Sequence, residues 1–124
     1  MNNRMITATL AIISSMYMVS MIEAAERFQK LTGQQIQAKF AGMEFADETH
    51  WGEVLNRNGT LQIYSMGHKG SGKWRVQKDQ LCLDHWKEPG GGCYDVWLAG
   101  NKVELRNKES SLPPEGVLQK PTDR

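Results

Sequence analysis

Hydrophobic and polar residues alternate in short runs from Met43 to Asn107, and turn-forming residues separate the runs. Alternation with a period of two is typical of strands that bury one face, and many short runs of this kind indicate an antiparallel all-β domain. The pattern predicts a mainly antiparallel all-β fold, a small meander or barrel of seven to eight strands with one short N-terminal helix. The expected strands are residues 43–48, 52–56, 60–66, 72–77, 80–86, 93–99 and 102–107.

The predicted helix covers the residues just before these strands. Thr32 and Gln35 have the spacing of a capping box, and Leu31 and Ile36 have that of a hydrophobic staple. Gly42 is suited to end the helix. A helix of about two turns is not stable alone in water, so we expect it to pack against the sheet.

Turn residues mark the connections between the expected strands. Residues 56–59 and the pair Gly100 and Asn101 are typical of tight hairpin turns. Two glycine-rich stretches, residues 67–72 and 87–92, are predicted to be flexible loops.

Alternation divides the strands 80–86 and 93–99 into two faces. The hydrophobic face, which we expect to join the core, holds Leu81, Leu83, His85, Tyr94, Val96 and Leu98. The opposite face holds Cys82, Asp84, Trp86, Cys93, Asp95 and Trp97. If the two strands are neighbours, the two cysteines can form a disulfide across them.

The face with the two tryptophans has two interpretations, because paired tryptophans are unusual on an exposed sheet surface. In the first, the helix at residues 33–40 packs over the tryptophans and the disulfide. In the second, Trp86 and Trp97 form a binding surface with the adjacent carboxylates of Asp84 and Asp95, since tryptophan is enriched at interface hot spots.

The N-terminus has the pattern of a secretory signal peptide. Arg4 is followed by an uncharged stretch from Met5 to Ile22 and then by small residues, and cleavage is expected after Ala24. A retained membrane anchor is the alternative, because the uncharged stretch is just long enough to span a bilayer. Serine and threonine residues dilute its hydrophobicity and favour cleavage.

This assignment divides the chain into a signal peptide (1–24), one β-barrel-like domain (25–108) and a tail (109–124). The tail is expected to be extended or disordered, because Pro113 and Pro114 cannot lie inside a sheet. Export would place the domain in the periplasm or outside the cell, where Cys82 and Cys93 can be oxidised.

Composition narrows the possible partners. Most methionines lie in the expected signal peptide, so the mature domain has no methionine-rich copper site. Its net charge is +1, with or without residues 1–24, which gives no basic surface for nucleic acid or for an anionic membrane. We expect a monomer that binds an unknown protein or a small ligand and that touches a membrane only through an uncleaved signal segment.

No catalytic or metal-binding motif stands out. The histidines His50, His68 and His85 lie in separate segments without metal-ligand spacing, and no nucleophile motif is present. Asp84 adjoins His85, but neighbouring strand residues point to opposite faces. We expect His85 to be a core histidine with a hydrogen-bond partner. The chain is therefore predicted to be neither an enzyme nor a metal- or cofactor-binding protein.

One polar cluster has two possible interpretations. Glu44, Asp47, Glu48 and His50 could hold a cation weakly, or they could form a solvated strand end, which we favour.

The order of several short motifs supports a family resemblance. They comprise Leu31, Thr32, Ile36, Phe40, Gly42, Trp51, Asn58, Gly59, Gly72, Trp74, Leu81, Cys82, Leu83 and Cys93. The order resembles a family of small exported bacterial domains of unknown function that join a short helix to a β-meander with a Gly-x-Trp…Leu-Cys…Cys core. The resemblance covers residues 28–107 and implies a lipocalin-like or calycin-like barrel in the cell envelope, with no known activity.

A weaker similarity points to inhibitors. Gly72, Trp74 and the pair Cys82 and Cys93 also resemble the small periplasmic inhibitors of secreted metalloproteases, and Ser71 with Gly72 resembles a signature of lysozyme inhibitors. From the sequence we expect a non-catalytic binding module of the cell envelope. The alternative is an inhibitor of a secreted hydrolase, either a metalloprotease or a lysozyme.

Overall fold

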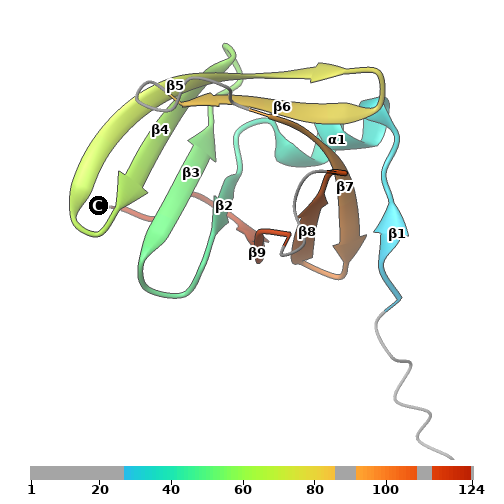
Figure 1. The fold of residues 1–124 in the computed structure, drawn as a ribbon. Helices are drawn as coiled ribbons and strands as arrows, with labels where there is room; N and C mark the ends of the chain where they lie inside the picture. Colours follow the sequence, from blue (N-terminus) through green and yellow to red (C-terminus); the bar gives the residue numbers. More distant parts are fainter. Residues whose placement is uncertain (1–26, 86–91, 109–112, 124) are drawn as a thin grey trace, which may run out of the picture.

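A computed structural model describes residues 27–85, 92–108 and 113–123, which form a small β-barrel (Figure 1). The predicted signal peptide, the loop at 87–91 and Trp86 lie outside the described residues. None of the described helical residues belongs to a segment with the length and hydropathy that crossing a membrane requires.

The described residues contain nine strands and one helix. They are β1 (Gln29–Lys30), α1 (Gly33–Phe40), β2 (Glu44–Ala46), β3 (Trp51–Leu55), β4 (Thr60–Ser65), β5 (His68–Gln77), β6 (Gln80–His85), β7 (Cys93–Ala99), β8 (Lys102–Arg106) and β9 (Glu115–Gln119). Each strand from β2 to β8 pairs antiparallel with the next one in the sequence, and β9 pairs back with β2. The result is a closed eight-stranded barrel, while β1 adds to β7 outside this ring. The predicted all-β fold with one short helix is confirmed.

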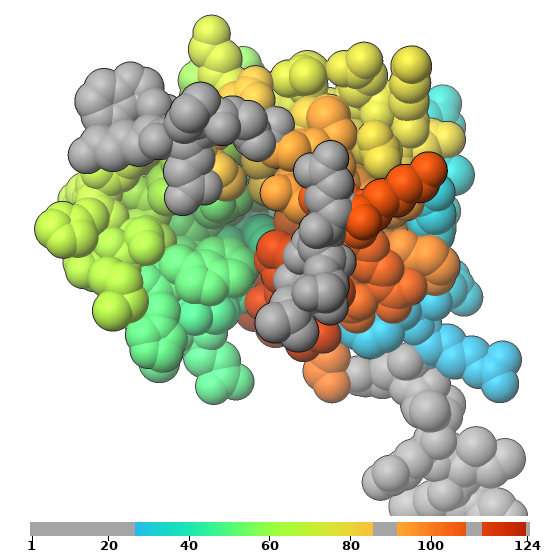
Figure 2. Space-filling model, viewed as in Figure 1, coloured from blue at the N-terminus to red at the C-terminus, as the bar shows by residue number. Residues whose placement is uncertain are grey.

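The strand β9 corrects the predicted tail. We expected residues 109–124 to lie outside the domain, but Phe45 of β2 pairs with Leu118, and β8 pairs with the other edge of β9. Pro113 and Pro114 precede β9, so their missing N–H groups do not interrupt its ladder. Figure 2 shows the C-terminal segment, in red, beside the green surface of residues near 50.

The turn between β4 and β5 corrects a second prediction. Residues 67–72 were expected to be a flexible loop, but only Met66 and Gly67 form the turn, both with positive φ (49° and 81°), and β5 starts at His68. Two-residue turns with positive φ at both positions match the twist of paired strands. The other glycines of this stretch, Gly70 and Gly72, therefore lie within a strand.

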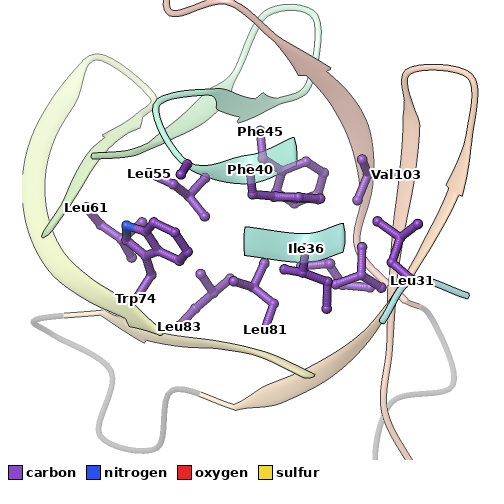
Figure 3. Packing of buried hydrophobic residues seen from close by; sticks show 13 residues of the cluster. Leu31, Ile36, Phe40, Phe45, Leu55, Leu61, Trp74, Leu81, Leu83 and Val103 are labelled. Atoms are coloured by element: carbon purple, nitrogen blue, oxygen red, sulfur yellow. The ribbon is translucent and has the colours of Figure 1, made fainter. Parts of the chain in front are cut away.

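The helix α1 closes one end of the barrel and directs Ile36 and Phe40 into its interior (Figure 3), while its other side is exposed. Ile36 and Phe40 are fully buried among inward-facing strand residues such as Trp74 and Leu81. The interpretation in which α1 covers the tryptophan face is wrong, because that face is the outside of the barrel. Two apolar side chains on a short helix are buried most completely where the curved sheet surrounds them.

The start of α1 agrees with the sequence analysis and is also tied to the barrel. Thr32 Oγ1 accepts the N–H of Gln35, and the Gln35 side chain accepts the N–H of Thr32, which completes the predicted capping box. The N–H of Gly33 donates to Asp79 Oδ1 at 2.6 Å. Asp79 lies in the turn between β5 and β6, so this bond fixes α1 to that end of the two strands.

The predicted disulfide is present between Cys82 and Cys93. The two residues stand directly opposite each other on β6 and β7, with their Cα atoms 4.0 Å apart. Cys82 is buried although it lies on the outer face of the sheet.

Candidate functional site

The two ends of the barrel differ in what fills them. The helix α1 packs near the turn at residues 78–79, which is one end of β5 and β6. At the other end of these strands lies a cavity of about 420 Å³. Its lining includes Trp51, Glu53, Ile63, His68, Gly70 and His85, and we call it the open-end cavity.

The register of the strands explains why the open-end cavity exists. Glu53 of β3 stands opposite Ile63 of β4, and Ile63 stands opposite Gly70 of β5, so all three point inward. Gly72 of β5 stands opposite His85 of β6. Because the inward position 70 carries no side chain, β5 leaves room for the cavity beside Glu53 and His85. Gly72 serves the close approach of β6 instead, since a Cβ there would collide with the backbone of Asp84.

Glu53 and His85 meet in this space. His85 Nε2 lies 2.6 Å from Glu53 Oε1, and the two side chains are 27% and 14% exposed for His85 and Glu53 respectively. An ionised carboxylate only accepts hydrogen bonds, so the imidazole N–H donates to Glu53. The pair places a strong acceptor group on the cavity wall beside the apolar side chains of Trp51 and Ile63.

The second oxygen of Glu53 is not satisfied. Glu53 Oε2 is buried and has no hydrogen-bond partner within the described part of the chain. A buried polar atom without a partner costs about 1–3 kcal/mol, and more when it is charged. Because Glu53 lines the cavity, a ligand bound there can supply the missing donor once the carboxylate turns toward it.

The rest of the wall combines apolar side chains, such as Trp51 and Ile63, with the polar residues Ser65, His68, Lys69 and Ser71. The ring of Trp51 packs edge-on against Phe45, with the ring centroids 4.9 Å apart. A smaller cavity of about 160 Å³ shares Trp51, Glu53 and His85 and extends toward Tyr94. Apolar walls with a few placed polar groups are typical of small-molecule sites.

The sequence predicted part of this site. It placed His85 on the inner face with a hydrogen-bond partner, and both features are confirmed, as is the outward position of Asp84. It did not single out Glu53, although the alternation of Trp51, Glu53 and Leu55 puts a carboxylate on the inner face of β3. It also placed His68 in a loop, whereas this residue begins β5 and lines the cavity.

The outer face proposed from the sequence is occupied by ion pairs. Asp84 contacts Arg75 at 3.1 Å. Asp95 contacts Lys30 at 3.5 Å and accepts from the Gln80 side chain at 3.2 Å. Both carboxylates are therefore engaged within the protein.

Trp97 lies on the same outer face and is half-buried. The guanidinium carbon of Arg106 lies 4.1 Å from the centroid of the Trp97 ring, and Arg106 Nε donates to Glu104 Oε1 at 2.7 Å. The structure places Asp95 and Trp97 together on β7, but Asp84 does not lie beside them. Because Cys82 pairs with Cys93, Asp95 lies beside Gln80, and Asp84 lies toward the opposite end of β6. Whether Trp86 joins them lies outside the described residues.

The polar cluster noted in the sequence separates into two parts. Glu44 is fully buried on the outer side of β2, where its carboxylate accepts the N–H of Thr122 at 3.0 Å. Asp47 instead organises the turn before β3 and contacts His50 at 3.2 Å. Glu48 is exposed in that turn.

Asp47 has a perturbed acidity. Burial alone would raise the pKa of its carboxyl, but the backbone N–H groups of Trp51, His50 and Thr49, followed by the His50 ring, lower the pKa below its ordinary value. The carboxylate therefore holds the turn that leads into Trp51. No group of three or more His, Cys, Asp and Glu side chains that could hold a metal occurs within residues 27–85, 92–108 and 113–123.

Comparisons with known proteins add no relative. No protein-family model, no curated protein and no solved structure matches this chain. The family resemblance stated from the sequence stays a prediction.

Proposed function

We propose that this protein is a non-catalytic binding protein that takes a small organic molecule into the open-end cavity. The observation that carries the proposal is the unsatisfied carboxylate oxygen of Glu53 on the wall of a cavity of about 420 Å³. Small-ligand pockets have volumes of about 300–1,000 Å³, and eight-stranded barrels can hold one small ligand.

The expected location is the cell envelope. The signal-like N-terminus predicts export to the periplasm or the medium, and the disulfide between Cys82 and Cys93 is consistent with an oxidising compartment. A binding role also agrees with the lack of a nucleophile motif in the sequence.

The outer face around Trp97 ranks second as a binding surface. Its carboxylates at Asp84 and Asp95 and the ring of Trp97 already have partners within the protein, so binding there would first break those contacts. Inhibition of a secreted hydrolase would use such a surface. It predicts a stoichiometric loss of activity when the mature protein is mixed with lysozymes or metalloproteases.

The cavity is tested by filling it. Gly70 points inward with ordinary backbone angles, and a Cβ added there would lie 3.7 Å from the Ile63 Cβ, which is normal contact. The variant Gly70→Val should therefore fold and occupy part of the cavity. Gln62→Val is the matched control, because Gln62 lies on the neighbouring strand β4 and its side chain is exposed on the outer face of the barrel.

The probe is prodan, a neutral naphthalene dye without a hydrogen-bond donor whose emission shifts to the blue in apolar surroundings. We expect the wild type and Gln62→Val to bind it equally and Gly70→Val to bind it at least about tenfold more weakly. Equal binding by Gly70→Val, or no binding by the wild type, would contradict the proposed function.

A further inference from the structure

We propose that the open-end cavity selects small organic amines, molecules with a protonated nitrogen at one end and a compact apolar body. This inference rests on the proposed function and adds the chemical class of the ligand. Three properties of the cavity support it, namely the acceptor at Glu53, the sign of its charge and the aromatic wall at Trp51.

The first property is that the Glu53 carboxylate needs a hydrogen-bond donor. Glu53 Oε1 is taken by His85, and Glu53 Oε2 is buried without a partner in the ranges that the structure describes. Neither oxygen of an ionised carboxylate can donate, so only a ligand with an N–H or O–H group completes the pair. An apolar ligand or an acceptor-only ligand leaves Oε2 unsatisfied.

The second oxygen can reach the ligand by a small movement. The terminal torsion of a glutamate is broad, so the carboxylate can turn at little cost. Glu53 lines both the larger and the smaller cavity, and either oxygen can remain beside His85 while the other turns toward the ligand.

The second property is charge. A hydrogen bond between a charged donor and a carboxylate is roughly twice as strong as a neutral one, so an ammonium group is preferred to a hydroxyl group. A ligand carboxylate would place a like charge beside Glu53, which is unfavourable at close range. Lys69 also lines the cavity, but it lies at an outward-facing, exposed strand position and can keep its ammonium group in solvent.

The third property is the wall around the carboxylate. Trp51 and Ile63 present apolar surface next to Glu53. An aromatic or aliphatic body of the ligand can pack on them, and the face of an indole also attracts a nearby cation. A phenyl ring on a short chain has a suitable size for this space.

The test uses isothermal titration calorimetry on the mature, disulfide-bonded protein with three probes of similar shape. They are 2-phenylethylamine, 2-phenylethanol and 3-phenylpropionate, which differ in the group that would face Glu53. We expect the amine to bind at least about tenfold more tightly than the alcohol, and the acid to bind most weakly.

The variant Glu53→Gln tests whether Glu53 is responsible for the preference for amines. It should weaken amine binding about tenfold or more and change alcohol binding less than about threefold. Glu48→Gln is the matched control, because it removes the same charge from an exposed position in the turn before Trp51. The Glu48→Gln variant should bind each of the three probes with an affinity within about twofold of the wild-type value.

The possible results separate this inference from the proposed function. Equal affinities for the three probes, or an amine affinity that Glu53→Gln leaves unchanged or that Glu48→Gln lowers equally, would overturn the inference even if prodan still binds in the cavity. Prodan binding without any amine binding would overturn it too. If Gly70→Val also leaves prodan binding unchanged, the proposed function fails as well.

Discussion

The closed end of the barrel and the open end have the same strands but different inward residues. At the closed end, Phe40 and Ile36 of α1 are fully buried against large apolar side chains of the barrel wall (Figure 3). At the open end, the inward position 70 of β5 is a glycine, and a hydrogen-bonded carboxylate and imidazole lie on the cavity wall. Dense apolar packing stabilises a fold, whereas a gap with an unsatisfied polar atom costs stability and fits a binding role.

The largest expected effect lies at the closed end. Phe40→Ala should lower the free energy of unfolding by about 3–5 kcal/mol, because it leaves a cavity that the surrounding barrel cannot fill. Ile63→Ala, at the partly exposed wall of the open end, should cost less than about 2 kcal/mol. Urea denaturation measures both. A cost for Ile63→Ala that equals that of Phe40→Ala would remove the difference between the two ends.

The disulfide is the next largest contribution. Replacing Cys82 and Cys93 together by alanine should lower the free energy of unfolding by about 3 kcal/mol, because the bond closes a short loop in the unfolded chain. It lies on the outer face, so prodan binding by the folded variant should not change. Loss of prodan binding in the folded variant would mean that the outer face shapes the cavity.

The pair at the open end should contribute little stability of its own. Replacing Glu53 and His85 together by leucine should leave the free energy of unfolding unchanged or raise it, because replacing both partners of a buried hydrogen bond by apolar groups is nearly neutral or stabilising. The same double variant should lose its preference for amines. A large loss of stability would show that the pair serves the fold rather than a ligand.

The hydrogen bond at the start of α1 tests the closed end more finely. Glycine readily adopts the positive φ of 56° that Asp79 has, so Asp79→Gly mainly removes the acceptor of the Gly33 N–H. It should cost about 1 kcal/mol, and Asp79→Asn, which retains an oxygen acceptor, should cost less. Both variants should bind 2-phenylethylamine as tightly as the wild type does. A change in this affinity would show that the closed end and the open end of the barrel are coupled.

The smallest effect is expected at Asp47. Its pKa is lower in the folded protein than in the unfolded chain, so the ionised carboxylate stabilises the fold above about pH 4, and this contribution is lost as the pH falls through the folded pKa. Asp47→Asn should therefore lower the urea midpoint at neutral pH, with a difference that shrinks toward about pH 3. A difference that grows on acidification would contradict this sign.

The sequence predicted most of the fold because its local signals were consistent. The capping box at Thr32 started α1, Gly100 and Asn101 formed the predicted hairpin turn, and alternation placed Cys82 opposite Cys93. The missing strands had weak signals. β1 has two residues, and β9 follows directly after a pair of prolines.

The rest depended on contacts between distant segments. Alternation showed which residues share a face, but it did not show that α1 closes one end of the barrel and does not pack over Trp97. The partner of His85 could not be identified, because Glu53 is 32 residues away and lies on another strand. The glycines at 70 and 72 resembled a loop, since the strand that contains them is defined by its neighbours and not by its own side chains.

One measurement tests the central claim, that the open end binds a ligand and the closed end holds the fold, most directly. Amide chemical shifts of the ¹⁵N-labelled mature protein are followed during titration with 2-phenylethylamine. We predict that the shifts concentrate at residues 51–53, 63–65, 68–72 and 85, with none in α1. Shifts that concentrate in α1 or around Trp97 and Arg106, or no shifts at all, would contradict the claim.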